Sequence, residues 1–86
     1  MFDEVKWNDE NKALFDRLMA NTPEQFKEIA LKATKEKAES IAKERGSEFV
    51  EIDDIAKACL VSAPPIFKPQ VINDLKREGI DADKYL

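Results

Sequence analysis

The residues that could carry chemistry in this 86-residue chain are few, and the most reactive of them is a single cysteine, Cys59. The chain contains no histidine, which excludes a Ser-His-Asp triad, a histidine metal site and a histidine proton shuttle. One cysteine cannot form an internal disulfide or a multi-cysteine zinc or iron–sulfur site. Because no histidine can activate it and no cationic cluster adjoins it in the sequence, Cys59 is predicted to be a small core residue. We therefore predict no catalytic residue.

Carboxylates are most crowded in residues 48–54, where four acidic side chains could suggest a calcium loop. The segment lacks the alternating oxygen ligands, the central glycine and the closing glutamate of an EF-hand loop. The only two glycines, Gly46 and Gly79, lie too far apart to form a phosphate-binding loop. We expect no metal and no cofactor, and we interpret Asp53 and Asp54 as the start of a helix, with Asp53 as its cap.

Four side chains are candidates for contact with a protein partner: Trp7, Lys37, Glu39 and Tyr85. Tryptophan and tyrosine are enriched at interface hot spots. Trp7 and Tyr85 could equally close the two ends of the core and leave their polar atoms in water. Lys37 projects within the apolar arc of a helix, where its stem can lie along the core edge while the ammonium group reaches water. The alternative for Lys37 is a cation aimed at an anionic partner.

The composition of the chain limits the class of protein. Its 14 basic and 18 acidic residues give a formal charge of −4, which disfavours nucleic acid as a partner because Lys and Arg supply most nonspecific affinity for phosphates. No stretch approaches 18 consecutive apolar residues, so no membrane partner is expected either. The acidic start lacks the features of a signal peptide, and a single cysteine suits a reducing compartment. We expect one intact domain, residues 1–86, located in the cytoplasm.

One long amphipathic helix is the main element that the sequence predicts. A capping box over Thr22–Gln25, with Thr22 as the cap, should start it at Pro23. The helix should run to Arg45 and stop at Gly46, which suits a left-handed C-terminal cap. Its expected buried side comprises Phe26, Ile29, Ala30, Ala33, Ala38, Ile41 and Ala42.

The other predicted elements are shorter. A first helix, capped by Asn8 or Asp9, runs to about Ala20 and buries Leu14, Phe15, Leu18 and Met19. Residues 49–52 form a short extended segment, residues 54–61 a third helix, and two prolines then break the chain. Residues 66–67 should be extended and pack on the core, before a fourth helix over 69–78 that ends at Gly79. The predicted fold is all-α, a small bundle of four helices around the long one.

The end of the long helix and the residues after it carry a family resemblance. Glu39, Ala42 and Gly46 fit a pattern that continues in Val50, Asp53, Ile55 and Ala58. With Val5-Lys6-Trp7, Pro23 and Phe26, this resembles the small helical domain at the C-terminus of the catalytic subunit of light-independent protochlorophyllide reductase, which also occurs as a stand-alone protein. The resemblance covers residues 5–60 as a helical core, and residues 63–86 form an extension with a proline-rich start and a helix.

The resemblance implies a non-catalytic accessory or docking module linked to tetrapyrrole and chlorophyll biosynthesis. The parent enzyme is an oxidoreductase that uses electrons from an iron–sulfur partner, and this chain lacks the cysteines for a cluster. The implied partner is a nitrogenase-like reductase subunit, with the chain itself a monomer or weak dimer. A competing resemblance links residues 38–58 to the last part of a histone fold, which implies a dimerising domain. Similarity of fold does not transfer activity.

Overall fold

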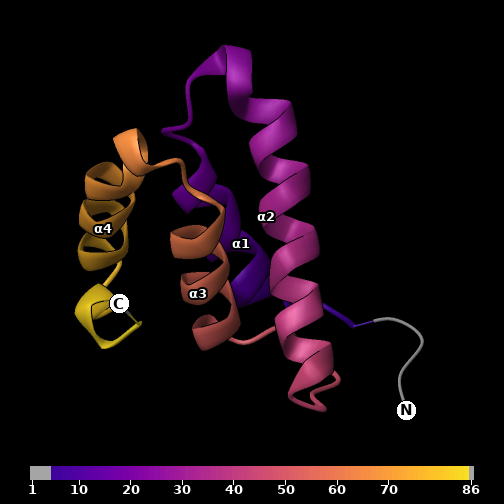
Figure 1. The fold of residues 1–86 in the computed structure, drawn as a ribbon. Helices are drawn as coiled ribbons and strands as arrows, with labels where there is room; N and C mark the ends of the chain where they lie inside the picture. Colours follow the sequence, from indigo (N-terminus) through magenta and orange to yellow (C-terminus); the bar gives the residue numbers. More distant parts are fainter. Residues whose placement is uncertain (1–4, 86) are drawn as a thin grey trace.

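The computed structural model describes residues 5–85 and confirms the predicted all-α fold. Four α-helices follow one another in this part of the chain, namely α1 (Asp9–Met19), α2 (Glu24–Glu44), α3 (Ile52–Ser62) and α4 (Lys68–Arg77) (Figure 1). Two 3₁₀ turns, η1 (Pro65–Phe67) and η2 (Ala82–Tyr85), precede and follow α4. None of the helices in the described range is long and apolar enough to cross a membrane.

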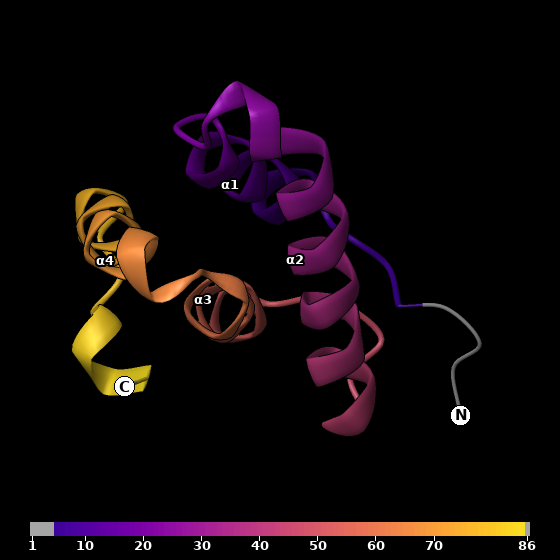
Figure 2. The same ribbon diagram turned by 45° about the horizontal axis from the view of Figure 1, so that its top comes forward.

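Helix α3 has neighbours on two sides, because it lies between α2 and α4 (Figure 2). It buries six of its 11 residues, whereas α2 buries only three of its 21. Helix α1 packs against both α2 and α4. The core therefore gathers around α3, and α2 contributes one narrow stripe to it.

Helix α1 begins and packs as predicted. Asn8 is its N-cap, and Asn8 Oδ1 accepts a hydrogen bond of 2.7 Å from the Asn11 N–H. The Asn11 side-chain amide donates to the Val50 carbonyl oxygen at 2.8 Å, which ties α1 to the segment after α2. The buried residues of α1 are the four that the sequence predicts, Leu14, Phe15, Leu18 and Met19.

The start of α2 differs from the prediction. The helix begins at Glu24, with Pro23 as its N-cap and no side chain bonded at that end, so the predicted capping box on Thr22 is wrong. The Thr22 N–H donates to the Met19 carbonyl oxygen at 3.1 Å. Thr22 therefore belongs to the turn that closes α1, one residue too early to cap α2.

Both glycines end helices through the same backbone arrangement, as predicted. Gly46 after α2 and Gly79 after α4 each have a φ of +80°, a conformation in which a Cβ atom would be strained. The N–H of the residue after each glycine donates to the carbonyl oxygen five residues earlier, at 2.9 Å in both cases. These are the hydrogen bonds of a Schellman motif, which satisfies carbonyl groups that the helix end would otherwise leave free.

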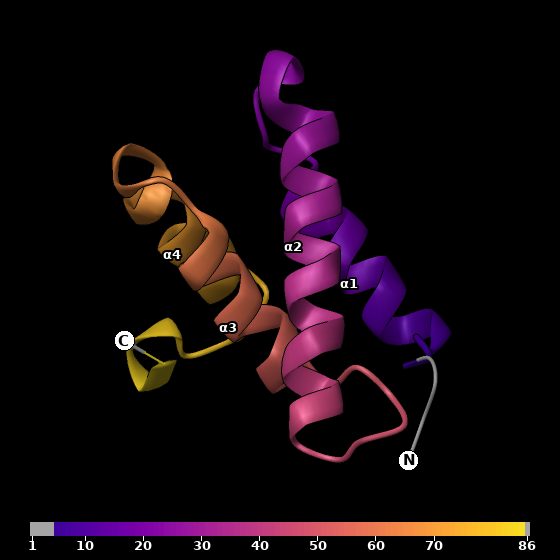
Figure 3. The same ribbon diagram turned by 45° about the vertical axis from the view of Figure 1, so that its right-hand side comes forward.

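The predicted buried side of α2 is wrong for the N-terminal half of the helix. Phe26 is 45% exposed and Ile29 is 73% exposed, and Ala33 is exposed as well. The fully buried residues of α2 are Thr34, Ala38 and Ala42. The cause is helix length, since α2 has 21 residues (about 32 Å) and α3 has 11 (about 17 Å). Helix α3 turns back along the C-terminal half of α2 and ends about half-way along it (Figures 1 and 3).

Phe49 and Val50 before α3 are extended, as predicted, and this segment pairs with the start of the described chain, but Ile52, predicted to be extended as well, already belongs to α3. The Lys6 N–H donates to the Glu48 carbonyl oxygen at 2.8 Å, and the Val50 N–H donates to the Lys6 carbonyl oxygen at 2.9 Å. These bonds form an isolated parallel bridge between Lys6 and Phe49. Val50 is fully buried, so the bridge anchors the lead-in of the chain to the core.

The start of α3 is fixed by a buried carboxylate, though not by the one predicted. Glu51 is the N-cap and Ile52 the first helical residue, so the predicted cap at Asp53 is wrong. Asp54 Oδ2 accepts a hydrogen bond of 2.9 Å from the Glu51 N–H and contacts Arg45 Nη2 at 2.6 Å, and its side chain is 1% exposed. The hydrogen bond to Asp54 raises the pKa of the Arg45 guanidinium above its usual value. Arg45 and Asp54 thus lock the end of α2 to the start of α3.

Residues 65–67 form the turn η1 and not the predicted extended segment. The Phe67 N–H donates to the Pro64 carbonyl oxygen at 2.9 Å, and the fixed φ of proline favours this turn. Ile66 is 80% exposed, so its predicted packing on the core is wrong. Phe67 is half-buried and contacts Phe26 in the N-terminal half of α2.

Candidate functional site

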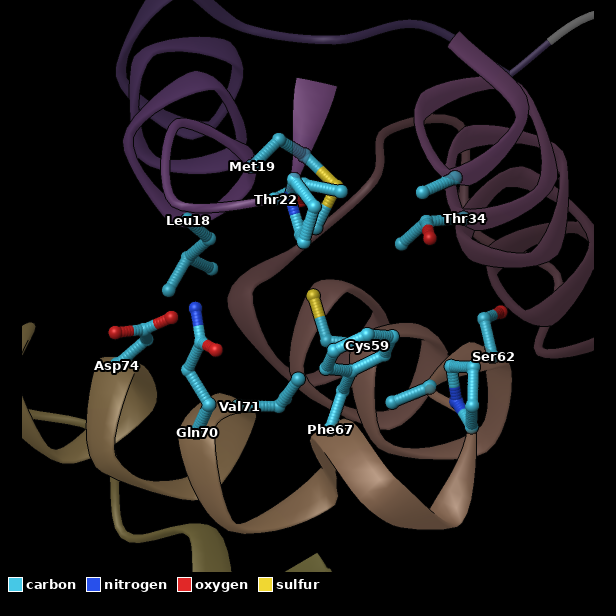
Figure 4. A pocket seen from close by; sticks show the side chains of 14 residues that line it. Leu18, Met19, Thr22, Thr34, Cys59, Ser62, Phe67, Gln70, Val71 and Asp74 are labelled. Carbon is cyan, nitrogen blue, oxygen red and sulfur yellow. The ribbon is translucent and has the colours of Figure 1, made fainter. Parts of the chain in front are cut away.

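A hollow of about 80 Å³ lies where the end of α1, the N-terminal half of α2, the end of α3 and the start of α4 meet (Figure 4). This volume exceeds what one water molecule needs and is about half that of a cavity that binds benzene. Most of its surface is apolar. Residues from each of these elements line it, among them Met19, Ala30, Thr34, Cys59, Phe67 and Val71.

The hollow exists because α3 stops while α2 continues. Ser62 is the last residue of α3, and Ala63 leaves the helix in an extended conformation because it precedes Pro64. Ser62, Ala63 and Pro64 all line the hollow, opposite Ala30 and Thr34 of α2. Small side chains on both sides leave the space between the two elements unfilled.

Two sulfur atoms point into the hollow from opposite sides, the Cys59 thiol from α3 and the Met19 thioether from α1 (Figure 4). Cys59 is 3% exposed, and the prediction that it is a core residue is confirmed. Burial, with a smaller contribution from the nearby Asp74 carboxylate, raises the pKa of the Cys59 thiol to about 12. The thiol therefore stays protonated at neutral pH, and a protonated thiol is a poor nucleophile.

The polar edge of the hollow is occupied by a carboxylate that already has partners. Asp74 is 6% exposed, and its Oδ1 atom accepts hydrogen bonds from Asn21 Nδ2 at 3.2 Å and from Arg77 Nη2 at 3.0 Å. Gln70 lies beside it, and its side-chain amide donates to the Asn21 carbonyl oxygen at 3.1 Å. The hollow consequently offers an apolar interior and one polar edge that its own neighbours hold in place.

An exposed apolar surface borders the hollow, and we call it the apolar rim. Phe26 and Phe67 are in contact there, with ring centroids 6.1 Å apart and an angle of 57° between the rings. Ile29 and Ile66 are the two most exposed large apolar side chains in the described residues, at 73% and 80%. The rim comprises Phe26, Ile29, Ala30, Ala33, Ile66 and Phe67.

Trp7 and Glu39, two of the predicted contact residues, meet each other. Trp7 Nε1 donates to Glu39 Oε2 at 2.7 Å, and the indole ring lies 5.2 Å from the Phe15 ring, centroid to centroid. Both side chains are half-buried. They fasten the start of the described chain to the C-terminal half of α2, whereas the rim lies on its N-terminal half.

Tyr85 and Lys37, the other two predicted contact residues, are placed apart from that pair. The Tyr85 hydroxyl donates to Asp53 Oδ1 and fastens η2 to the start of α3. This hydrogen bond is the main reason that the pKa of Tyr85 rises to about 12. Trp7 and Tyr85 both pack against the core, and the polar atom of each donates to a carboxylate, which for Tyr85 is the exposed Asp53.

Lys37 is exposed on α2, four residues beyond Ala33. Residues four apart lie on the same face of a helix, so Lys37 continues the line of the apolar rim toward the C-terminal half of α2. The predicted path of its ammonium group into water agrees with this exposure. Within residues 5–85, no three His, Cys, Asp or Glu side chains are grouped so as to hold a metal ion.

The apolar rim is the part of the site that sequence reasoning missed. The residues Phe26, Ile29, Ala30 and Ala33 follow the spacing i, i+3, i+4, i+7, which is typical of a buried helix face and predicts one here. The signal that they stay exposed is the position of Pro64. Pro64 limits α3 to 11 residues, so α3 is too short to cover the whole length of α2.

This chain belongs to the family described as "Protein of unknown function (DUF2621)", whose model matches residues 3–86. The match includes residues 63–86, which the resemblance to the reductase left out. No curated protein matches the chain. No solved structure matches it.

The resemblance to the protochlorophyllide reductase domain is therefore wrong, and the family match overturns it. The residues that suggested it are explained by the folding of a helix end. Glu39 binds Trp7, Ala42 is fully buried, and Gly46 has the positive φ of a C-terminal cap. Any helical domain with this packing uses such residues, so the pattern is not specific to the reductase.

Proposed function

We propose that this domain is a non-catalytic protein-docking module whose contact surface is the apolar rim and the hollow beside it. The observation that carries the proposal is the exposure of Ile29 (73%) on α2 and of Ile66 (80%) on η1, the two elements whose Phe26 and Phe67 rings are in contact. Contiguous apolar surface around a concave site is typical of interaction sites. The hollow can accept one side chain of a partner, which is how interface hot spots are commonly built.

Further support comes from what the rim does not do for the fold. Phe26, Ile29 and Ala33 lie to one side of the line of Ala30, Thr34, Ala38 and Ala42, whose last three residues are the buried ones of α2. A helix needs only one apolar stripe to join a core. The second stripe on α2 is thus available for contact with another molecule.

The histone-like alternative receives no comparable support. In a histone-like dimer, the extended segment after the long helix would take part in the contact between the two chains. Here that segment pairs with Lys6 of the same chain. The nitrogenase-like partner depended on the reductase resemblance and loses its support with it. Docking through the rim is the function that the geometry favours.

Site-specific photo-crosslinking in cells that make the protein tests this proposal. A benzophenone amino acid replaces Ile29 or Ile66 in the rim, or Val61 as a matched control. Val61 is 66% exposed but comes two residues after Cys59, so it points to the opposite side of α3 from the hollow. We expect protein adducts from positions 29 and 66 and few or none from position 61.

If neither rim position yields an adduct while the variants remain folded, the rim is not a docking surface. Equal adduct yields from positions 61, 29 and 66 would also contradict the proposal, because they indicate random collisions. Circular dichroism of each purified variant serves as the folding control.

A further inference from the structure

We propose that the partner docks an amphipathic helix on the apolar rim and that aspartate and glutamate side chains border the apolar face of that helix. This inference rests on the docking function proposed above and specifies the chemistry of the partner. Two features of the rim carry it: the shape of its apolar surface and the sign of the charges around it.

The shape of the rim suits a helix. Phe26, Ile29, Ala30 and Ala33 form a straight line of two helical turns, about 10 Å long, on the outside of α2. Helix-in-groove recognition uses anchors at this i, i+3, i+4, i+7 spacing. The two alanines allow close approach of a second helix. Phe67, which contacts Phe26, also lines the hollow, and the hollow can receive one anchor side chain.

The charges next to the rim are mainly positive. Glu36 and Lys37 follow Ala33 by three and four residues and so lie beside it on α2. The acid Glu28 adjoins the rim in the sequence, and so do three lysines, Lys27, Lys32 and Lys68. None of these three lysines forms an ion pair with another residue of the described range, where the ion pairs involve other cations such as Arg17 and Arg45. Lys6, Lys76 and Arg77 are paired with acidic side chains as well.

A positive border is unusual for a chain with a formal charge of −4. The rim and the charged residues beside it, with Glu36 and Lys37 included, carry four lysines and two glutamates, a sum of +2, so the rest of the chain carries −6. Complementary charges orient partners during encounter and suppress wrong ones. An acidic helix is therefore attracted to the rim and repelled by the remaining surface.

The same observations disfavour two other occupants. A second copy of this chain would bring Lys27, Lys32 and Lys68 against the same three lysines, and like charges in contact are unfavourable. An anionic membrane is attracted by basic clusters of about four to eight residues, and it would meet the −6 of the remaining surface. A flat membrane would also leave the hollow unfilled.

Two synthetic peptides test the proposal on the full chain. Each is an about 18-residue helix former with leucine at i, i+3, i+4 and i+7, and the flanking positions are all glutamate in one and all lysine in the other. Titrations followed by NMR of the Ile29 and Ile66 methyl groups give both the location and the dissociation constant. We expect the glutamate peptide to bind at least about tenfold more tightly at low salt, with the ratio shrinking at 1 M salt, where the Debye length is about 3 Å.

Matched variants separate charge from apolar contact. Replacing Lys32 and Lys68 by glutamine should bring the ratio of the two dissociation constants toward one. The control replaces Lys12 and Lys57, which are exposed and have no ion pair within the described residues, and should leave the ratio unchanged. Ile29→Asn should weaken binding of the glutamate peptide at least about tenfold, and Val61→Asn less than about twofold.

Failure of this inference can be told apart from failure of docking itself. If both peptides bind equally and Ile29→Asn weakens both, the rim docks helices and the acidic preference is wrong. If neither peptide shifts the Ile29 and Ile66 signals, the helix proposal is wrong, and the crosslinks decide docking independently. Binding to vesicles of phosphatidylcholine and phosphatidylserine through Ile66, or concentration-dependent dimer formation through Ile29, would also overturn the acidic-helix proposal.

Discussion

The two halves of α2 differ in which apolar side chains they bury and which they expose, and the difference follows from what lies beside each half. In the covered half, Ala38 and Ala42 are fully buried against α3. In the uncovered half, Phe26 and Ile29 are large and exposed. Small residues allow two helices to approach closely, whereas large ones present apolar area to a partner. One half of α2 therefore belongs to the core, and the other half presents the surface for which we propose docking.

The same contrast explains how polar groups are used. Around the covered half, carboxylates have partners within the chain, as in the pairing of Glu39 with Trp7 and of Asp54 with Arg45. Beside the uncovered half, Lys27 and Lys32 have no such ion pair among the described residues. Side chains in the first region therefore hold the fold together, and those in the second are available to another molecule.

The largest expected effect comes from shortening one isoleucine in each region. Ile55 is fully buried in α3, and Ile29 is 73% exposed on α2. Ile55→Ala should lower the free energy of unfolding by about 2–5 kcal/mol because it leaves a cavity. Ile29→Ala should change it by less than about 0.5 kcal/mol. Urea denaturation measures both, and a cost above about 1 kcal/mol for Ile29→Ala would show that the rim is part of the core.

Enlarging one alanine in each half of α2 tests how closely each half is packed. Ala38→Leu inserts atoms into the contact with α3, where there is no room, and should cost about 1–3 kcal/mol of the free energy of unfolding. Ala33→Leu should change it by less than about 0.5 kcal/mol, because leucine is a good helix former and the site is exposed. If both substitutions cost the same in thermal melts, the two halves of α2 do not differ in packing.

Substitutions of Glu39 and Lys37, two residues apart on α2, test whether the contact of Trp7 with the covered half stabilises the fold. Glu39→Ala removes the hydrogen bond from Trp7 Nε1 and should cost about 1 kcal/mol of the free energy of unfolding. Lys37→Ala, two residues away on an exposed side, should change it by less than about 0.5 kcal/mol. Trp7 fluorescence should also shift toward that of exposed tryptophan in the Glu39→Ala variant only. A larger cost for Lys37→Ala would contradict this division.

Much of the fold could be predicted from the sequence because its signals are local. The Asn8 cap, the buried stripe of α1 and the stops at Gly46 and Gly79 depend on a few adjacent residues. Cys59 could be placed in the core because the sequence holds no histidine and no adjoining cationic cluster that could activate it. The helix caps predicted at Thr22 and Asp53 lie one or two residues away from the observed caps, because several residues in each segment could act as caps.

Periodicity alone could not predict the candidate site, because the site depends on how far one helix extends beyond another, and in the sequence only the position of Pro64 indicates this. Periodicity shows that Phe26, Ile29 and Ala33 share a face of α2, but it cannot show whether a neighbour covers that face. Ile66 is similar, since an apolar residue between two prolines and a phenylalanine fits either a packed segment or an exposed turn. The pairing of Trp7 with Glu39 joins residues 32 positions apart, a distance over which local patterns carry no information.

The smallest expected effect concerns the Tyr85–Asp53 hydrogen bond, which fastens η2 to α3 away from the rim. The pKa of Tyr85 rises to about 12, above the value of about 10 for an unfolded tyrosine. The bond therefore stabilises the fold fully below about pH 10, and this contribution is lost as the pH rises through 12. Being near the surface, it should raise the Tm by only about 1–3 °C at pH 8 relative to Tyr85→Phe. That difference should decrease at pH 11, while the Cys59 thiol, whose pKa is also about 12, affects both proteins equally. A difference in Tm that stays constant from pH 8 to pH 11 would show that the Tyr85 hydroxyl does not hold this contact.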